Sequence, residues 1–490
     1  MKVMKFGGTS VGTPQRMQEV TNLVTKSGEP VFVVLSAMSG TTNSLIEISD
    51  YLYKKNADGA NEVINRLEAK YMKHVDELYT KEDTKNQTRD FLKEEFNYLR
   101  SFTKEIFTSF EEKNIVAQGE VISTNMVVNY MKEQGFKAVL LDALDFMRTD
   151  KNAEPDLIYI KEKLCALMAE NEGQQVYITQ GFICRNAYGE VDNLQRGGSD
   201  YTASLIGAAL NAEEIQIWTD IDGMHNNDPR VVDKTAPVHQ LHFDEAAELA
   251  YFGAKILHPT CVQPAKYAGI PVRLLNTMDP DAEGTTISNN TEYGKIKAVA
   301  AKDNIIAIKI KSSRMLLATG FLRKVFEIFE SYQTPIDMVC TSEVGVSMSI
   351  DNSAHLGEIV DELKKYGTVT VDTGMCIICV VGDLDWSNIG FETRVMDAFK
   401  NIPVRMVSYG GSNYNISFLI KEEDKKWALQ ALSAKLFNPE SAIVSEVRQS
   451  TNFGNEKPYA IVRYRKGVEG KTKFSVGSLS DNNSSTTTYN

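Results

Sequence analysis

Cysteine and histidine are both scarce in this chain, with six of each among its 490 residues. Sparse cysteines that lie mostly within apolar stretches are typical of a protein kept in a reducing compartment. Only Cys376 and Cys379 form a CxxC pair, and because it lies in the β-rich run MCIICVVG we expect buried strand cysteines rather than a redox or metal pair. His239 and His242 are three residues apart, but without a third ligand nearby they do not indicate a structural zinc site.

Excess positive charge and long apolar runs are lacking as well. The formal net charge is −12, whereas a nucleic-acid-binding protein usually carries a basic face. No apolar run approaches the length needed to cross a bilayer, and no long apolar stretch with a small-residue cleavage site stands at the N-terminus. We therefore expect a soluble cytoplasmic protein that binds neither nucleic acid nor a membrane.

The first 290 residues alternate between strand and helix patterns, as in a layered α/β domain. Six runs have the character of buried strands, and their order predicts a mainly parallel sheet. These runs are residues 3–6, 31–35, 138–141, 176–179, 215–219 and 272–276. Residues 55–115 are charged and helical in pattern, with a polar break at 83–87. We interpret them as a solvated helical excursion without a catalytic role.

The pattern changes after the segment NNTEYGK near residue 290. Residues 305–374 predict strand, helix, strand, strand, helix, strand, and a second round of the same order runs from 375 to 437. This is an internal repeat of about seventy residues with a βαββαβ order.

The second round lacks its last strand, and the run KAVAAKD at 297–303 is a strand without a partner. We expect this run to complete the second unit, so that the first unit is inserted within it. The alternative donors are AIVSEV or YAIVRY in the tail, residues 438–490. Beyond Asp481 the tail is polar and of low complexity, which predicts disorder.

The opening stretch KFGGTSVGTP predicts a strand, a glycine turn and a helix. Thr13 is a suitable N-cap, and Pro14 suits the first helical position because its missing N–H is not needed there. Backbone N–H groups and a helix dipole then point at one spot, which favours an anion. The P-loop pattern does not fit, because its lysine should follow the second glycine. On this stretch alone, phosphate binding and a simple βα turn both remain open.

Three further stretches have similar features. SAMSGTTN follows a buried strand, and in QRGGSD a second glycine pair precedes Ser199 and Asp200, with Arg196 before it. The planar guanidinium of an arginine can bind a carboxylate through two hydrogen bonds, but a capped helix with a surface arginine accounts for the same sequence equally well. WTDIDG and DPR read equally well as turns, and Lys255 in FGAKILHP alone would be a surface lysine.

Taken together and in this order, these motifs with KFGGTSV, QGE and ITQGF closely resemble the aspartate kinase family. The resemblance implies an amino-acid-kinase fold at residues 1–290 with a mainly parallel sheet. Two interleaved ACT domains of ferredoxin-like type would follow, at 305–374 and at 297–303 plus 375–437. The implied reaction is transfer of the ATP γ-phosphoryl group, with Mg²⁺, to the β-carboxylate of L-aspartate. This reaction begins the synthesis of lysine, threonine and methionine.

The resemblance also implies roles for individual residues. Lys5, Asp200 and Lys255 match the catalytic positions. The implied nucleotide contacts are Lys5, Gly7, Gly8, Ser10, Thr219, Asp220, Arg230 and Lys255. The implied aspartate contacts are Thr42, Glu120, Arg196 and Ser199, with Glu120 on the ammonium and Arg196 on the α-carboxylate. No residue is implied as a metal ligand. Some relatives have a tyrosine where this chain has His225, which leaves a nucleotide contact at that position open.

The repeated units imply regulation by an amino acid and assembly into a homodimer or tetramer through the ACT domains. The implied effector site comprises Met315, Thr319, Phe321, Leu322, Asp337, Ser342 and Glu343, with Asp337 on the effector's amino group. Leu317 and Ala318 replace polar residues of the lysine-sensitive pattern. We favour lysine as the inhibitor and leave threonine or insensitivity open.

Two other functions are compatible with parts of the pattern. A non-catalytic amino-acid sensor would keep the fold, but every charged position needed for turnover is present. Kinases of glutamate, acetylglutamate or carbamate commonly lack the repeated C-terminal pair. We therefore expect an aspartate kinase.

Overall fold

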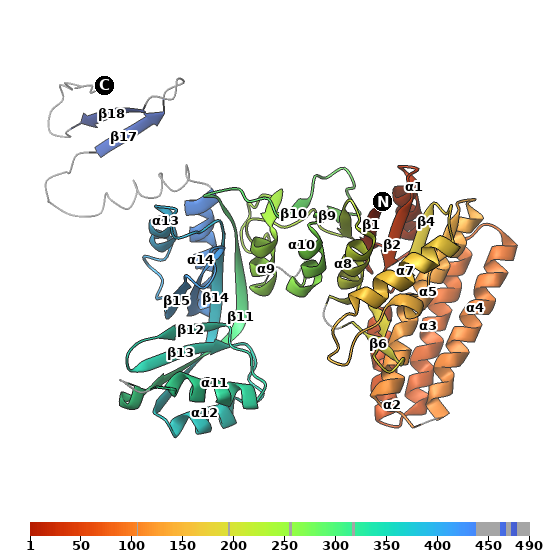
Figure 1. The fold of residues 1–490 in the computed structure, drawn as a ribbon, viewed down its shortest axis with the longest axis horizontal. Helices are drawn as coiled ribbons and strands as arrows, with labels where there is room; N and C mark the ends of the chain where they lie inside the picture. The colour runs from red at the N-terminus through yellow and green to blue at the C-terminus, as the bar shows by residue number, and fades with distance from the viewer. Residues whose placement is uncertain are drawn as a thin grey trace. The chain divides into compact units, whose positions relative to one another are not determined.

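In a computed structural model of the chain, the described residues are 1–104, 106–194, 197–253, 257–315, 319–437, 461–466 and 472–477 (Figure 1). They form two compact units, Met1–Leu436 and Phe437–Asn490. In the second unit β17 (Ile461–Lys466) and β18 (Thr472–Gly477) pair as an antiparallel hairpin. The polar stretch predicted beyond Asp481 lies outside the described residues.

An eight-stranded sheet forms the centre of the N-terminal half (Figure 1). Its order is β3-β4-β2-β1-β7-β9-β10-β8, and every neighbouring pair is parallel except β9 with β10. The strands are β1 (Lys2–Phe6), β2 (Val31–Leu35), β3 (Ala138–Leu140), β4 (Val176–Gln180), β7 (Ile215–Thr219), β8 (Gln240–His242), β9 (Val272–Asn276) and β10 (Thr285–Ser288). All six predicted strands are present, and the prediction of a mainly parallel sheet is confirmed.

Helices cover both faces of this sheet, and successive residues of a strand alternate between the two cores. Val3 lies in one core, and Met4 and Phe6 lie in the other. The helices are α1 (Pro14–Thr25), α2 (Thr41–Tyr53), α5 (Ser109–Glu133), α6 (Ala143–Phe146), α7 (Leu157–Glu170), α8 (Gly198–Leu210), α9 (Phe243–Tyr251) and α10 (Gln263–Ala268), with a 3-10 turn at Pro259–Val262. A hairpin of β5 (Ile183–Arg185) and β6 (Val191–Asn193) lies between β4 and α8. Thr13 caps α1 and Pro14 opens it, as predicted.

The predicted helical excursion forms α3 (Ala57–Leu78) and α4 (Glu82–Ser101), followed by a 3-10 turn at Phe102–Lys104. The predicted break at 83–87 is wrong, because α4 runs through it. The chain turns at Tyr79–Lys81 instead, where Glu133 of α5 accepts the N–H groups of Thr80 and Lys81. Nor is the excursion only solvated: its apolar faces are buried in one core with α1, α2 and α5.

The C-terminal half is built on a six-stranded sheet of order β12-β13-β11-β14-β16-β15. Its strands are β11 (Ile296–Lys311), β12 (Met338–Thr341), β13 (Gly345–Ile350), β14 (Thr368–Gly382), β15 (Met406–Tyr409) and β16 (Asn415–Lys421). Its helices are α11 (Phe321–Ser331), α12 (Leu356–Lys364), α13 (Phe391–Ala398) and α14 (Lys425–Leu432), with 3-10 turns at Ser313–Met315 and Glu422–Asp424 and a π-helical turn at Ser433–Phe437.

Two long strands join the repeated units. Ile296–Lys302 of β11 pairs antiparallel with the second half of β14, and after a register shift Ile305–Lys311 pairs with its first half. The run KAVAAKD therefore completes the second βαββαβ unit, and the two units are interleaved as predicted. Of the alternative donors, β17 pairs with β18, and AIVSEV lies outside the described residues.

The CxxC cysteines and the two closely spaced histidines have the following surroundings in the fold. Cys376 and Cys379 are fully buried in β14, and burial raises the pKa of both thiols. His242 accepts the N–H of Asp244 at the start of α9, and His239 lies 3.3 Å from Glu283. Within the described ranges, no helix combines the length and apolar character needed to cross a membrane.

Candidate active site

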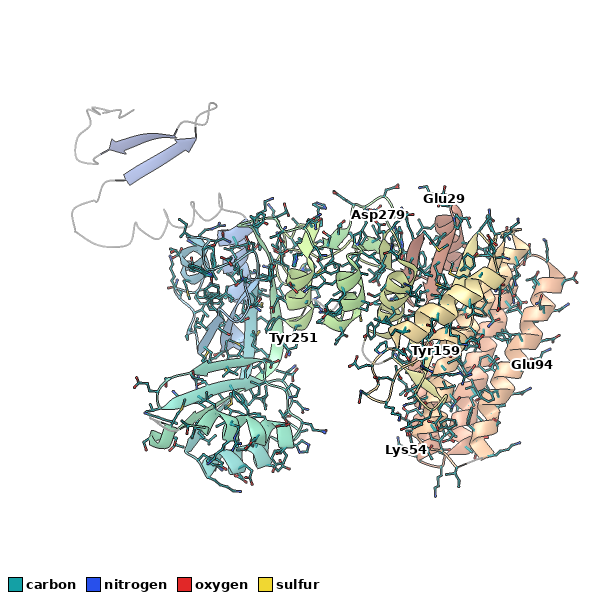
Figure 2. The ribbon with its side chains drawn as sticks, viewed as in Figure 1. Glu29, Lys54, Glu94, Tyr159, Tyr251 and Asp279 are labelled. Carbon is teal, nitrogen blue, oxygen red and sulfur yellow. The ribbon has the colours of Figure 1, made fainter. Side chains whose placement is uncertain are left out.

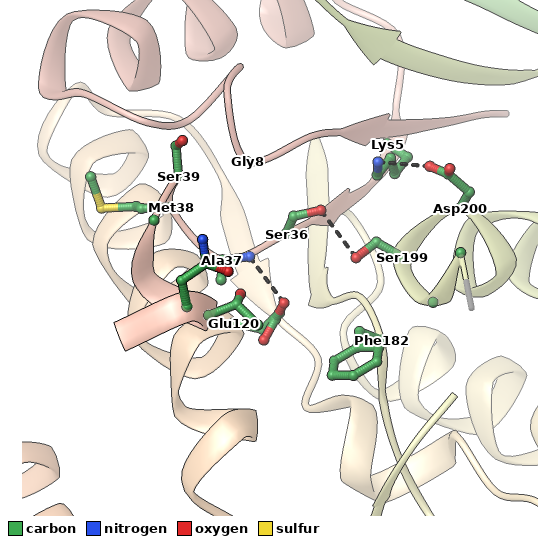
Figure 3. Close-up of a pocket in the computed structure, with 15 residues that line it drawn as sticks. Lys5, Gly8, Ser36, Ala37, Met38, Ser39, Glu120, Phe182, Ser199 and Asp200 are labelled. Carbon is green, nitrogen blue, oxygen red and sulfur yellow. Dashed lines mark hydrogen bonds and ion pairs between the residues drawn. The ribbon is translucent and has the colours of Figure 1, made fainter. Parts of the chain in front are cut away.

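A cavity of about 420 Å³ opens where the first glycine turn, the SAMSGTTN loop and the start of α8 meet (Figure 3). In a parallel sheet, such sites form beyond the carboxyl ends of the strands. The lining residues come from five separate segments of the sequence. They are Lys5, Gly8, Ser36, Ala37, Met38, Ser39, Gly40, Thr42, Asn43, Glu120, Phe182, Gly197, Gly198, Ser199 and Asp200.

Lys5 and Asp200 form an ion pair at one side of this cavity (Figure 3). The distance from Lys5 Nζ to Asp200 Oδ1 is 2.7 Å, and the two side chains are 12% and 14% exposed. Lys5 stands near the end of β1, and Asp200 in the first turn of α8. Gly197 precedes this helix with φ 77°, and a Cβ there would lie 2.3 Å from Cys261 Sγ. Only glycine fits at position 197, and this turn sets where α8 begins and so where Asp200 lies.

The Gly7–Gly8 turn lies directly against the SAMSGTTN loop. Gly8 O accepts the N–H of Ser39 at 3.1 Å, and a Cβ on Gly8 would lie 2.7 Å from Ala37 O. The two loops can approach this closely because Gly8 has no side chain. Ser10 was predicted as part of the same phosphate loop, but its hydroxyl is fully buried and bonded to Thr277 Oγ1 at 2.6 Å. It anchors the turn and does not line the cavity.

Two serines connect the SAMSGTTN loop to α8. Ser36 Oγ donates to Ser199 Oγ at 3.0 Å (Figure 3). Ser123 of α5 in turn donates to Ser36 O at 2.8 Å. A Cβ on Gly181 would lie 2.6 Å from Ser199 Cβ, so the chain after β4 is also close. The hydroxyl of the predicted substrate residue Ser199 is therefore oriented by Ser36.

Glu120 presents a buried carboxylate at the other side of the cavity. It lies on α5 and is only 4% exposed. Its Oε1 accepts the N–H of Ala37 at 3.1 Å, while Oε2 has no hydrogen-bond partner among the described residues (Figure 3). Burial raises the pKa of Glu120 to about 7, against the lowering effect of the Ala37 N–H. An incoming cation would supply the missing partner and favour the ionised form.

The predicted nucleotide contacts Thr219, Asp220 and Arg230 do not line this cavity. Thr219 ends β7, which neighbours β1, and its hydroxyl donates to Asp220 at 3.1 Å. Arg230 is 83% exposed and donates from Nε and Nη2 to the two oxygens of Asp228, at 2.9 and 2.8 Å. His225 bonds Asp222 and Thr235, both at 2.8 Å.

Thr42 lines the cavity as predicted for a substrate contact. Arg196 and Lys255, the predicted substrate arginine and nucleotide lysine, lie outside the described residues. Of the predicted catalytic residues, the structure therefore brings together Lys5 and Asp200.

The predicted effector residues fall at two places in the first repeated unit. Phe321 lies in its core with Met315 packed against it, Leu322 and Thr319 are exposed near the start of α11, and Ser342 and Glu343 follow β12. The Asp337 side chain is 1% exposed, and its Oδ1 bonds both Lys302 Nζ and the hydroxyl of Tyr251, each at 2.7 Å. Tyr251 is labelled in Figure 2. Tyr251 is the last residue of α9, so Asp337 connects the six-stranded sheet with the N-terminal half.

Sequence reasoning missed several residues of the cavity. Ser36 and Phe182 were in the quoted motifs but received no role. The Ser36–Ser199 bond joins residues 163 apart, and Phe182 has a left-handed backbone with φ 71°, a conformation uncommon outside glycine. The only available signal for either was its place inside a motif.

Comparisons with known proteins agree with this geometry. Residues 1–276 match the amino acid kinase family, and residues 378–436 match an ACT domain. Aspartokinase 1 of Arabidopsis thaliana chloroplasts is 35% identical over 93% of this chain and 83% of its own. Lysine-sensitive aspartokinase 3 of Escherichia coli is 32% identical over 89% of this chain and 99% of its own.

Two solved structures of E. coli aspartokinase III are also similar, both at 31% identity and over 89% of this chain. The complex with aspartate and ADP, described as the R-state, has a TM-score of 0.77 and is covered completely. The complex with lysine and aspartate, described as the T-state, has a TM-score of 0.71 and is covered over 99% of its length.

Proposed function

The chain belongs to the aspartokinase family of enzymes, and from this premise we propose that it transfers the γ-phosphoryl group of ATP to the β-carboxylate of L-aspartate. The product is 4-phospho-L-aspartate, at the start of lysine, threonine and methionine synthesis. One observation carries the proposal: the Lys5–Asp200 pair lines a single cavity with Glu120, whose carboxylate oxygen Oε2 has no hydrogen-bond partner among the described residues.

Aspartate is held by its non-reacting groups. Glu120 receives the ammonium, Arg196 the α-carboxylate, and the hydroxyls of Thr42 and Ser199 complete the contacts. This orientation directs the β-carboxylate towards Lys5. A β-carboxylate has a reference pKa of about 3.9, so it is already ionised at neutral pH and requires no general base.

The remaining task is to bring two anions together. Lys5 and the turn at Gly8 receive the transferring phosphoryl group, whose transition state spreads negative charge over its oxygens. The Gly7 N–H is not available for this contact, because it donates to Trp218 O at 3.1 Å. Asp200 holds the Lys5 ammonium at 2.7 Å, and Ser10 anchors the turn through Thr277. Lys255, Thr219, Asp220 and Arg230 contact the rest of the nucleotide.

Mg²⁺ fits this site as an ion that binds together with the nucleotide phosphates. No group of three or more metal-ligating side chains occurs in the part of the chain that the structure describes. Mg²⁺ is commonly held by substrate phosphates and waters with one or two carboxylates, and Asp200 is a carboxylate in this cavity. When bound, the ion neutralises phosphate charge.

The reaction is tested by trapping the acyl phosphate. The protein is mixed with Mg-ATP and one of L-aspartate, L-glutamate, N-acetylglutamate or carbamate, and hydroxylamine converts any acyl phosphate to a coloured hydroxamate. Colour with aspartate alone is the expected result. A stronger signal with another acceptor would replace the proposed substrate, and no signal with any would favour the non-catalytic sensor.

Arg196→Ala is expected to raise the aspartate KM by about 10- to 100-fold with a smaller change in kcat. The guanidinium grips a carboxylate that does not react, and a hydrogen bond to a charged group is worth roughly 1.5–3 kcal/mol. Steady-state kinetics at saturating ATP measure both constants. An unchanged aspartate KM would show that this orientation of the substrate is wrong.

We further propose that the C-terminal half regulates the enzyme. Its parts would be a first ACT domain at 305–374 and a second at 297–303 plus 375–437, after a catalytic domain at 1–290, and their edges would form a homodimer or tetramer. Lysine is the favoured effector, supported by the similar E. coli enzyme crystallised with lysine. Asp337, with one buried oxygen lacking a partner among the described residues, suits the effector's amino group.

Lysine at millimolar concentration is therefore expected to lower the rate of hydroxamate formation at subsaturating aspartate. Assays with lysine, threonine and both together distinguish the three alternatives. If all three leave the rate unchanged, the regulatory proposal is wrong even though the catalytic one stands.

A further inference from the structure

Helix α3, which packs against α4, makes contacts with the active-site loop that the reaction outlined above does not use. The loop is Ser36–Asn43, which supplies seven of the cavity's lining residues from Ser36 to Gly40 and at Thr42 and Asn43. α3 packs against α2, and the first three residues of α2 are the last three of this loop. Two adjacent residues of α3, Lys70 and Tyr71, bond the loop itself.

Tyr71 reaches the loop from inside the protein. Its side chain is fully buried, and its hydroxyl lies 2.7 Å from Thr41 Oγ1, which is fully buried too. Its ring is 6.0 Å from that of Phe96 on α4, so both helices of the pair hold it in place. Thr41 begins α2 directly after Gly40, which has φ 81° and supplies no side-chain cap. The Tyr71 hydroxyl thus holds the point where the loop becomes a helix.

Lys70 reaches the loop from the surface. Its Nζ donates to Ser39 O at 3.2 Å. The backbone N–H of Ser39 donates to Gly8 O of the glycine turn. Ser39 is therefore held on one side by the phosphate turn and on the other by α3.

The position of this loop also decides the environment of Glu120. Ala37 N–H is the hydrogen-bond donor to the Glu120 carboxylate, and it lies two residues before Ser39. α5 approaches so closely that a Cβ on Gly119 would lie 2.8 Å from Ala37 Cβ. Burial raises the pKa of Tyr71, and the negative charge of neighbouring Glu120 adds to this rise. Tyr71, Thr41, Ala37 and Glu120 are thus one connected group.

We propose that Tyr71 and Lys70 are positioning residues for aspartate binding, acting through the Ser36–Asn43 loop on the Ala37 N–H and Glu120. The helical pair α3–α4 is on this view part of the substrate-binding apparatus, contrary to the interpretation from sequence. The inference rests on the proposed function, since it assumes that Glu120 receives the substrate ammonium.

Tyr71→Phe tests the proposal because it removes one hydroxyl and leaves the ring. We expect the aspartate KM to rise about fivefold, the effect of losing one neutral hydrogen bond, with the ATP KM within twofold of the wild type. Tyr79→Phe is the matched control. Tyr79 is buried in the same core and its hydroxyl donates to Met126 O at 2.8 Å, away from the loop. It should lower thermal stability similarly and leave the aspartate KM unchanged.

Lys70→Met provides a second test that does not disturb the core. Its control is Lys73→Met on the same helix, because Lys73 is exposed and its one ion pair within the described part of the chain is with Glu77, at 3.6 Å. Lys70→Met should raise the aspartate KM by two- to fivefold and Lys73→Met should not.

The pH profile separates positioning from a general loss of stability. A weaker Ala37 N–H bond stabilises the Glu120 carboxylate less, so its pKa rises. The midpoint of the aspartate KM profile should therefore move to higher pH in Tyr71→Phe and Lys70→Met but not in the controls. Among the described residues, the other titratable groups at this cavity or loop are Lys5, Lys70, Tyr71 and Asp200, and all are present in both controls.

The proposal is overturned if Tyr71→Phe and Tyr79→Phe change the aspartate KM equally, or if neither Tyr71→Phe nor Lys70→Met changes it. These outcomes differ from failure of the proposed function, in which the wild-type protein itself forms no hydroxamate from aspartate.

Discussion

Lys5→Ala is expected to lower kcat by about 10²- to 10³-fold while the aspartate KM changes little, the range seen when one donor to a developing anion is removed. The Lys5 ammonium is placed near the end of β1 and held by Asp200 at 2.7 Å. The positive charge of Lys5 stabilises the transition state most, because the negative charge of the transferring phosphoryl group is then spread over its oxygens. The variant also leaves the Asp200 carboxylate, 14% exposed, facing the phosphates without a counterion. Rapid-quench and steady-state assays at saturating ATP measure the effect.

Two further variants make this test specific. Lys5→Met keeps most of the side-chain length and should behave like Lys5→Ala if charge is the cause. Lys2→Ala removes an exposed lysine from the same strand and should retain normal turnover. A Lys5→Ala enzyme with near-normal kcat and a raised ATP KM would assign Lys5 to nucleotide binding and contradict the proposed role.

Glu120→Gln is expected to raise the aspartate KM by about 10- to 100-fold, because a neutral amide replaces the carboxylate that we propose receives the ammonium. In the wild type, Glu120 must be ionised to bind, and burial raises its pKa to about 7. Below pH 7 the group is protonated, so the aspartate KM should rise towards tenfold per pH unit as pH falls. Above about pH 8 the KM should be constant. Tyr71 stays uncharged throughout this range, because burial raises its pKa further above the usual value of about 10.

The variant should also abolish this pH dependence, which distinguishes lost charge from distorted packing. Glu133→Gln is the control: Glu133 is buried on the same helix and accepts N–H groups from the turn between α3 and α4. It should lower the melting temperature and leave the aspartate KM and its pH profile unchanged. A Glu120→Gln profile that still bends near pH 7 would assign the titration to another group.

Local pattern determined much of this protein in advance. The buried runs of β1, β2, β4, β7 and β9, the cap at Thr13 and the glycine turn after Lys5 depend on residues close together in the chain. The interleaved repeat was also predictable from the sequence, because the second unit lacks its last strand and the run at 297–303 is a strand without a partner. The motifs therefore identified the family, and they predicted Lys5, Thr42, Glu120, Ser199 and Asp200 as site residues, all of which line the cavity.

Tertiary structure alone decided which of these side chains meet and what environment each has. Ser36 meets Ser199, Ser10 turns to Thr277, and Tyr71 bonds Thr41. The break between α3 and α4 lies where Glu133 accepts two backbone N–H groups, and not at the polar residues 83–87. The raised pKa of Glu120 likewise follows from burial by distant elements. Hydrogen-bond partners and desolvation depend on segments that approach only when the chain folds, so no local pattern of residues contains them.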